Sequence, residues 1–127
     1  VVAFASGVYN RPNITPGRLQ MVKEELKNLH TPVAYILGGP SDIAYANGMD
    51  DVGRISHIPV FAGNQSVGHS GTFQLANGGD WARAGVAWLD WQLKGSRTAG
   101  RMFTGKACGF CKDASWTIVR KQFPETP

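Results

Sequence analysis

Residues 31–72, TPVAYILGGPSDIAYANGMDDVGRISHIPVFAGNQSVGHSGT, contain two short apolar runs that each lead through glycine to a polar residue. The first run, residues 32–37, leads into GGPSD, and the second, residues 58–62, leads into GNQSVGH. Such runs are typical of buried parallel strands. Because the carboxyl ends of parallel strands meet at one edge of a sheet, we expect Asp42 and His69 to lie close together there. A carboxylate beside an imidazole is the arrangement that orients a histidine base.

The composition is that of one globular domain. The chain has 127 residues, of which 43% are hydrophobic and 10% aromatic, and this is sufficient for a packed core. The formal net charge of +4 comes from basic residues that are spread along the chain, so we expect no nucleic-acid partner. No apolar run approaches the roughly 20 residues of a membrane helix, so we expect no membrane span.

A first helix is expected to begin at Thr15 and Pro16, which suit the N-cap and the first helical position. Apolar residues then recur at helical spacing on one face, namely Leu19, Val22, Leu26 and Leu29. The polar residues of the same segment are expected to face solvent, namely Lys23, Glu24, Glu25, Lys27 and Asn28. The helix should end before Pro32, because a residue that precedes proline disfavours helical backbone angles.

Further helices are expected on either side of the second polar loop. Residues 47–55 predict a short helix with Asp50 and Asp51 on its solvated side. Residues 80–95 predict the longest helix, which should end at Gly95. The spacing of its aliphatic residues predicts a buried face of Ala82, Val86, Leu89 and Leu93, flanked by Trp81, Trp88 and Trp91. A shorter helix over residues 98–103 and an edge strand over residues 116–123 should follow.

The order of these elements predicts an α/β fold with a parallel sheet of about three strands, flanked by helices, and a C-terminal edge strand. Residues 1–127 are expected to form a single domain with a CxxC-containing tail at residues 104–127. Residues 1–5 predict a strand that leaves an apolar edge, so we expect a missing N-terminal half or a second chain to complete the sheet. We therefore expect the chain to be either processed or part of a longer one.

Three segments carry a resemblance to a known family: PVAYILGGPSDIAY, then IPVF with VGH, and then AWLDWQLKG. Together they resemble the C-terminal half of an α/β-hydrolase, in particular its secreted esterase- or lipase-like members, and the resemblance covers nearly the whole chain. It implies a partial α/β-hydrolase fold whose triad follows the order nucleophile, acid, histidine. Asp42 then matches the acid and His69 the base.

The resemblance also implies what the chain by itself does not contain. The nucleophilic serine and an oxyanion-hole loop are expected upstream of residue 1, so this chain alone should be inactive. The expected location is outside the cell or in the periplasm. The expected substrate is a small-molecule or polymeric carboxylic ester. Neither a cofactor nor a metal is expected.

Several residues remain open to more than one interpretation. Asp42 also suits the N-cap of a short helix. Ser70 in GHSGT resembles a nucleophile elbow, but Thr72 stands where the motif requires glycine. The loops at the same sheet edge supply candidates for an acyl or alcohol pocket, namely Tyr9, Asn10, Tyr45 and Phe73.

Cys108 and Cys111 form a CxxC motif with three possible functions. A zinc site needs about four ligands, and no second Cys or His pair lies nearby in the sequence. A thioredoxin-like site requires the motif to open a helix after a strand, which is not its predicted place here. A local disulfide is favoured, and the resemblance to secreted hydrolases supports it.

The sequence therefore predicts a hydrolase that uses a Ser-His-Asp triad on carboxylic esters. Two alternatives from other classes remain open. One is a non-catalytic fragment or assembly protein that associates through its open sheet edge. The other is a thiol-based redox protein that uses the CxxC motif.

Overall fold

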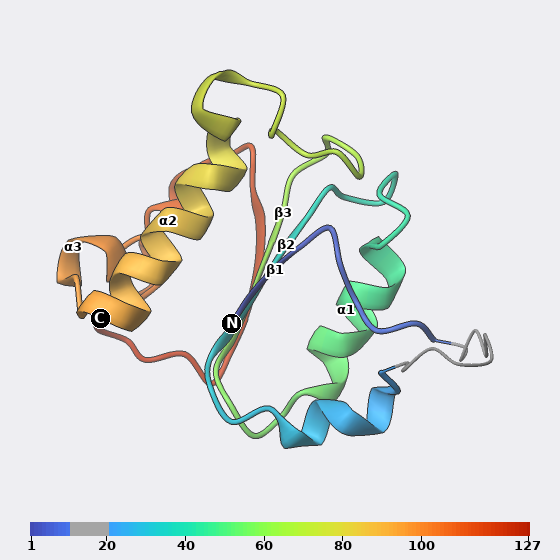
Figure 1. Ribbon diagram of the computed structural model, residues 1–127. Helices are drawn as coiled ribbons and strands as arrows, with labels where there is room; N and C mark the ends of the chain where they lie inside the picture. The colour runs from blue at the N-terminus through green and yellow to red at the C-terminus, as the bar shows by residue number, and fades with distance from the viewer. Residues whose placement is uncertain (11–20) are drawn as a thin grey trace.

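In the computed structural model, which describes residues 1–10 and 21–127, four strands form one sheet in the order β1-β2-β3-β4 (Figure 1). The strands are β1 (Val2–Phe4), β2 (Val33–Leu37), β3 (Val60–Asn64) and β4 (Thr117–Lys121). The first three are parallel, and β4 runs antiparallel to β3 at the far edge. The expected α/β class and the C-terminal edge strand are confirmed, in a sheet that is mixed rather than wholly parallel.

Helices cover both faces of this sheet (Figure 1). One face carries η1 (Lys23–Asn28) and α1 (Tyr45–Arg54), and the other carries α2 (Gly79–Lys94) and α3 (Arg97–Gly100). Two short 3-10 turns complete the set, η2 (Ala76–Gly78) and η3 (Phe110–Lys112). The start of the predicted first helix lies outside the described residues, and its described part is η1. None of the helices in the described ranges combines the length and apolar character needed to cross a bilayer.

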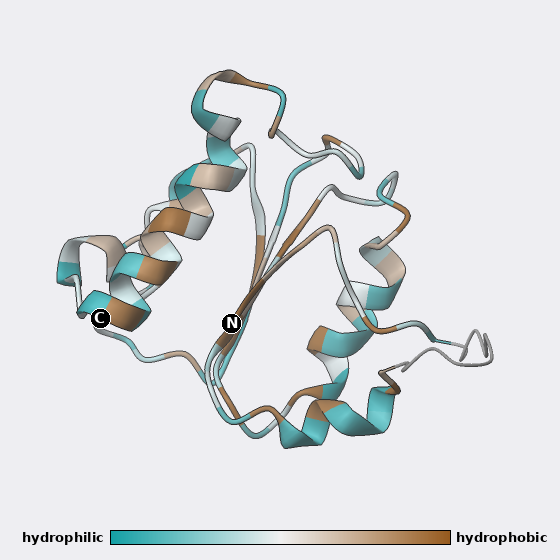
Figure 2. Cartoon of the chain, in the orientation of Figure 1, coloured by the Kyte–Doolittle hydropathy of each residue, from teal (hydrophilic) through white to brown (hydrophobic). Residues whose placement is uncertain are grey.

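The central strand β2 is buried on both sides, as its uninterrupted apolar run predicts. Ala34 and Ile36 face a cluster that includes the α2 side chains, whereas Val33, Tyr35 and Leu37 face a cluster that includes α1. This alternation follows from the two-residue period of a strand. Figure 2 shows the apolar band that runs along the strands between the two layers of helices.

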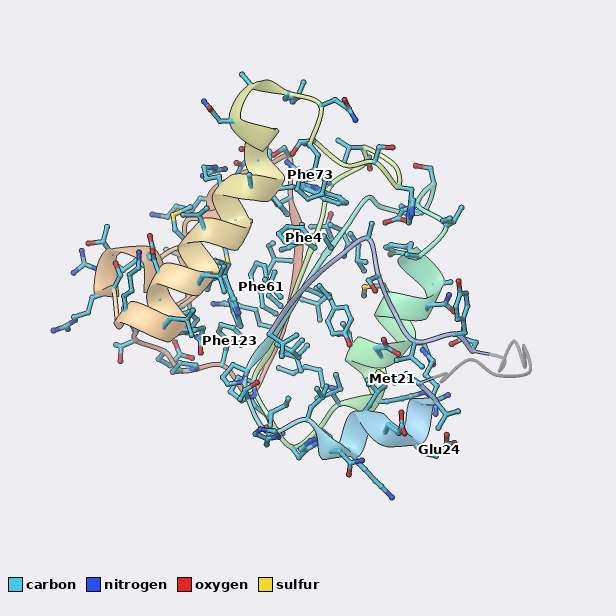
Figure 3. The ribbon with its side chains drawn as sticks, viewed as in Figure 1. Phe4, Met21, Glu24, Phe61, Phe73 and Phe123 are labelled. Atoms are coloured by element: carbon cyan, nitrogen blue, oxygen red, sulfur yellow. A yellow bond between two sulfur atoms is a disulfide. The ribbon has the colours of Figure 1, made fainter. Side chains whose placement is uncertain are left out.

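The predicted buried face of α2 was wrong. The residues that pack on the sheet are Trp81, Ala84, Gly85 and Trp88, while the aliphatic residues Val86, Leu89 and Leu93 are exposed. A Cβ at Gly85 would lie 2.6 Å from the Phe4 ring, so glycine permits the close approach of helix and strand. Because tryptophan buries more apolar area than an aliphatic side chain, the aromatic face is the one that packs inward. Phe4 and Phe61 lie on this side of the sheet (Figure 3).

The predictions that Lys23 and Asp51 face solvent were also wrong, because the two form a buried ion pair. Asp51 also accepts hydrogen bonds from the Val8 amide at 2.8 Å and the Tyr35 hydroxyl at 3.3 Å. Burial and the neighbouring Asp51 raise the pKa of the Tyr35 hydroxyl. Lys23 reaches Asp50 as well, at 3.0 Å. The cluster therefore connects η1, α1, β2 and the loop after β1.

Cys108 and Cys111 are joined in a disulfide, which confirms the favoured interpretation of the CxxC motif. Cys108 is buried in the cluster on the α2 side of the sheet, and Cys111 is half-buried against it. The bond therefore closes a small loop around η3 in a region that is already packed.

Reduction of this disulfide is expected to lower the free energy of unfolding by about 2 kcal/mol, because closing so short a loop removes little chain entropy. Urea unfolding with and without dithiothreitol measures the difference. The Cys108→Ala/Cys111→Ala variant serves as a control, since reductant should not change its stability. Complete unfolding in reductant alone at 25 °C would contradict the expectation.

Candidate functional site

The loops after β2 and β3 are held together by backbone hydrogen bonds. The amides of Val67 and Gly68 donate to the carbonyl oxygen of Gly38 at 3.2 Å and 2.9 Å. A Cβ at Gly38 would lie only 2.0 Å from the carbonyl oxygen of Gly68, so this contact requires glycine. Gly68 itself has a φ of +74°, which L side chains rarely adopt. The two loops that carry Asp42 and His69 are thus fixed relative to each other.

Asp42 organises its own loop and contacts the histidine. Its carboxylate accepts hydrogen bonds from the Gly38 amide at 2.9 Å and the Ala44 amide at 2.8 Å. The Nδ1 of His69 lies 2.7 Å from Oδ1 of the same carboxylate. Burial by itself raises the pKa of Asp42, but the two amides and His69 outweigh it and the pKa is lowered. Asp42 is therefore an ionised, almost fully buried hydrogen-bond acceptor.

His69 is held at one ring nitrogen and open at the other. With Nδ1–H donating to Asp42, Nε2 carries the lone pair of the neutral ring. Among residues 1–10 and 21–127, the structure gives Nε2 no hydrogen-bond partner, and the side chain is 50% exposed. The ring is thus oriented by a carboxylate and can accept a proton at Nε2.

A cleft of about 260 Å³ adjoins His69. Its walls come from the loop after β1, from the segment that joins β2 to α1 and from the first turn of α1, namely Ala5, Ser6, Gly7, Tyr9, Ile43, Ala44 and Asn47. Ile43 is 80% exposed and follows Asp42 directly in the sequence. The cleft therefore places apolar side chains and the polar Ser6 and Asn47 beside the open face of the imidazole.

The structure separates the four predicted pocket residues. Tyr9 lines the cleft, and the Asn10 amide donates to the Asn47 side chain at 3.3 Å on the surface. Tyr45 packs against the cluster on the α1 side of the sheet. Phe73 makes edge contacts with Phe4 and Trp81, with ring centroids 5.3 Å and 5.5 Å apart (Figure 3). Only Tyr9 of the four is a wall of the cleft.

Sequence reasoning missed Ile43 and Asn47 as cleft residues. The available signal was that Ile43 directly follows the candidate acid and that Asn47 lies five positions after it, near the carboxyl edge of β2.

Within the part of the chain that the structure describes, no three His, Cys, Asp or Glu side chains converge in a way that suits a metal ion.

The contribution of Asp42 to stability is expected to depend on pH. Its pKa in the folded chain lies below the ordinary value of 3.8, so the ionised carboxylate stabilises the fold above that pH. This stabilisation is lost as the pH falls through the lowered folded pKa. In urea unfolding, the stability difference between the wild type and Asp42→Asn should thus be large at pH 7 and smaller at pH 2.

The matched control is Asp90→Asn, because Asp90 is a partly exposed carboxylate that pairs with Lys94 on the surface of α2. Its stability difference should be small at both pH values. An equal loss of stability for Asp42→Asn at pH 7 and pH 2 would show that the ionised form of Asp42 is not what stabilises the loop.

The arrangement can move a single proton to and from a hydroxyl group that enters the cleft. The ionised carboxylate fixes the tautomer of His69 and would stabilise the imidazolium when it forms.

This chain matches no model of a known protein family and no curated protein.

Proposed function

We propose that this chain is the C-terminal part of a secreted α/β-hydrolase-type serine esterase or lipase. It would contribute Asp42 and His69 as the acid and the base of a Ser-His-Asp triad. The observation that carries the proposal is the 2.7 Å contact between His69 Nδ1 and the buried Asp42 carboxylate, at the ends of two adjacent parallel strands. The resemblance in sequence supports the same pair in the same order.

The proposed reaction is acyl transfer in two steps. A serine hydroxyl attacks the ester carbonyl carbon while Nε2 of His69 takes the hydroxyl proton, and the imidazolium then gives this proton to the departing alcohol oxygen. A water molecule next attacks the acyl-enzyme, again with His69 as the base, and the serine is regenerated as the carboxylic acid leaves. Asp42 holds the ring in position throughout and stabilises its charged form.

The proposal locates the nucleophile upstream of this chain, and the position of β1 supports that location. Within the described ranges, β1 pairs only with β2 and forms one edge of the sheet. A further parallel strand on that side would end at the same edge as the loops of Asp42 and His69. A serine at the end of such a strand would face the cleft from the side opposite β3.

The experiment is active-site labelling with a fluorophosphonate of the protein that carries this chain, at its full natural length. We expect one modified serine outside residues 1–127, and labelling should be lost in the His69→Ala variant. Modification of Ser6, which lines the cleft, would place the nucleophile in this chain instead. Labelling that is independent of His69 would reject the proposed triad.

Secretion is part of the proposal, and the disulfide between Cys108 and Cys111 supports it. Disulfides form and persist in oxidising compartments, such as the cell exterior and the periplasm.

The open edge favours a second candidate function, assembly through β1. A second cleft, of about 480 Å³, lies beside this strand and is lined mainly by apolar residues that include Val1, Ala3, Met21 and Val33. Sedimentation of residues 1–127 would test this function. A dimer that is abolished by Val2→Pro, which removes a backbone donor of the edge strand, would support assembly. A monomer at every concentration would exclude it.

A further inference from the structure

His69 lies on a tight turn in the loop that joins β3 to α2 (Figure 1). The amide of Gly71 donates to the carbonyl oxygen of Gly68 at 3.1 Å and closes the turn around His69. A Cβ at Gly71 would lie 2.3 Å from the ring of Trp81, so the turn lies directly on the indole. Gly71 also has a φ of +58°, which L side chains rarely adopt. The turn therefore contacts α2 at a position where the close approach requires glycine.

Thr72 ties the end of this turn to the start of α2. Its hydroxyl accepts a hydrogen bond from the amide of Trp81 at 2.9 Å and donates one to the carbonyl oxygen of Gly78 at 2.9 Å. The first amides of a helix have no partner within the helix, and Gly78 at the N-cap position has no side chain to supply one. Thr72 is buried and supplies this partner from outside the helix. The hydroxyl is therefore a buried link between the loop and the helix.

The two sides of the turn are held by different elements. On the side before His69, backbone amides bond to the carbonyl oxygen of Gly38 in the loop after β2. On the side after it, Thr72 bonds to α2, whose Trp81 is fully buried against the sheet. Closely packed interior side chains shift little, so α2 is a rigid support for the turn. Within the described ranges, the imidazole itself makes one hydrogen bond, from Nδ1 to Asp42.

We infer that Thr72 is a positioning residue for His69. The inference rests on the proposed function, in which His69 is the base, and adds a residue that sets the place of that base. Asp42 is fixed by two amides of its own loop, so the geometry of the pair depends on where the turn holds the imidazole. Without the Thr72 hydroxyl, the turn loses its attachment to α2, and the 2.7 Å contact between Nδ1 and the carboxylate is no longer enforced. A displacement of about 1 Å can cost on the order of 100-fold in rate.

The first test is the Thr72→Val variant of the protein that carries this chain, at its full natural length. Valine has nearly the shape of threonine but can neither accept from the Trp81 amide nor donate to the Gly78 carbonyl. We expect kcat on p-nitrophenyl acetate to fall about tenfold or more. KM should change little, because Thr72 is not a wall of the cleft. Thr72→Ser keeps the hydroxyl and should retain nearly all of the wild-type kcat.

Thr104→Val is the matched control. Thr104 is another buried threonine, and its hydroxyl donates to the carbonyl oxygen of Gly100 in α3 at 3.0 Å. Neither residue belongs to the turn or to the cleft, so this variant should lose thermal stability but no kcat. Thermal melting monitored by circular dichroism compares the stability of the variants. If Thr72→Val melts at a lower temperature but keeps the wild-type kcat, Thr72 only caps α2 and the inference is overturned.

The second test observes the His69 ring without catalysis. Long-range proton–nitrogen NMR correlations report which ring nitrogen carries the proton, and comparison with His69→Ala identifies the signals. In mildly alkaline buffer the wild type should show the Nδ1–H form, as donation to Asp42 requires. Thr72→Val should move part of the population to the Nε2–H form, whereas Thr72→Ser and Thr104→Val should not. Identical tautomer populations in the wild type and Thr72→Val would overturn the inference.

The two tests separate this inference from the proposed function. If ester hydrolysis requires His69 but is unaffected by Thr72→Val, the positioning inference fails and the hydrolase proposal stands. If the protein hydrolyses no ester while Thr72→Val changes the tautomer of His69, the proposed function fails and the positioning role of Thr72 stands.

Discussion

The His69→Ala variant of the protein that carries this chain is expected to lose about 10³-fold or more of its kcat on p-nitrophenyl acetate. The imidazole is the only described group placed to accept a proton beside the cleft while bonded to a buried carboxylate. Without it the serine hydroxyl stays protonated at neutral pH and attacks slowly. The loss should appear in kcat rather than in KM, because His69 acts on the transition state.

The same variant is expected to remain folded, since half of the His69 side chain is exposed. The matched control is His57→Ala. His57 is an exposed histidine whose ring contacts the Leu29 carbonyl, away from the cleft, so its loss should leave kcat unchanged. Asp42→Asn should lower kcat by about 10⁴-fold, because the amide stabilises the wrong tautomer of His69. Retention of wild-type kcat by His69→Ala would refute the proposed mechanism.

Replacing Lys23 by methionine is expected to lower the free energy of unfolding by about 3–5 kcal/mol. Asp51 would remain fully buried, and among the described residues it would keep hydrogen bonds from the Val8 amide and the Tyr35 hydroxyl. A buried charge that loses its ionic partner keeps its desolvation cost without the attraction that offsets it. Urea unfolding monitored by tryptophan fluorescence measures the change.

Lys27→Met is the matched control, because Lys27 belongs to the same short helix but is exposed. Its effect should stay within about 0.5 kcal/mol. Adding Asp51→Asn to Lys23→Met should recover part of the lost stability, since the amide has no charge and still offers an oxygen to the Val8 amide. A double variant less stable than Lys23→Met alone would show that the unpaired charge is not the main cost.

Much of the fold could be predicted from local signals in the sequence. The strand predicted within residues 33–37 coincides with β2, because five consecutive apolar residues suit a position covered on both faces. The helix predicted over residues 80–95 corresponds to α2, which ends at Gly95 with a φ of +65°. These signals are carried by neighbouring residues, so they can be read without knowledge of the tertiary contacts.

Predictions of which side chains are buried were less successful. Asp51 lies on the same face of α1 as other buried residues at helical spacing, namely Gly48, Val52 and Ile55. A carboxylate can occupy that face only because Lys23 reaches it from a segment 28 positions away. The buried face of α2 is likewise set by the tryptophans, since Trp81 and Trp88 pack against Phe4 and Phe61 on the same side of the sheet.

The sequence by itself determined which segments form the strands, their order along the chain, and the sheet edge at which Asp42 and His69 were expected to meet. Parallel strands deliver their carboxyl ends to one edge whatever packs around them, so this placement needs only the apolar runs and the glycines that follow them. Only the tertiary structure placed Tyr9 and Ile43 in the wall of the cleft and Phe73 against Trp81. It also showed that Lys23 and Asp51 form a buried ion pair. Those choices depend on contacts between distant segments, and such contacts leave no periodic signal in the local sequence.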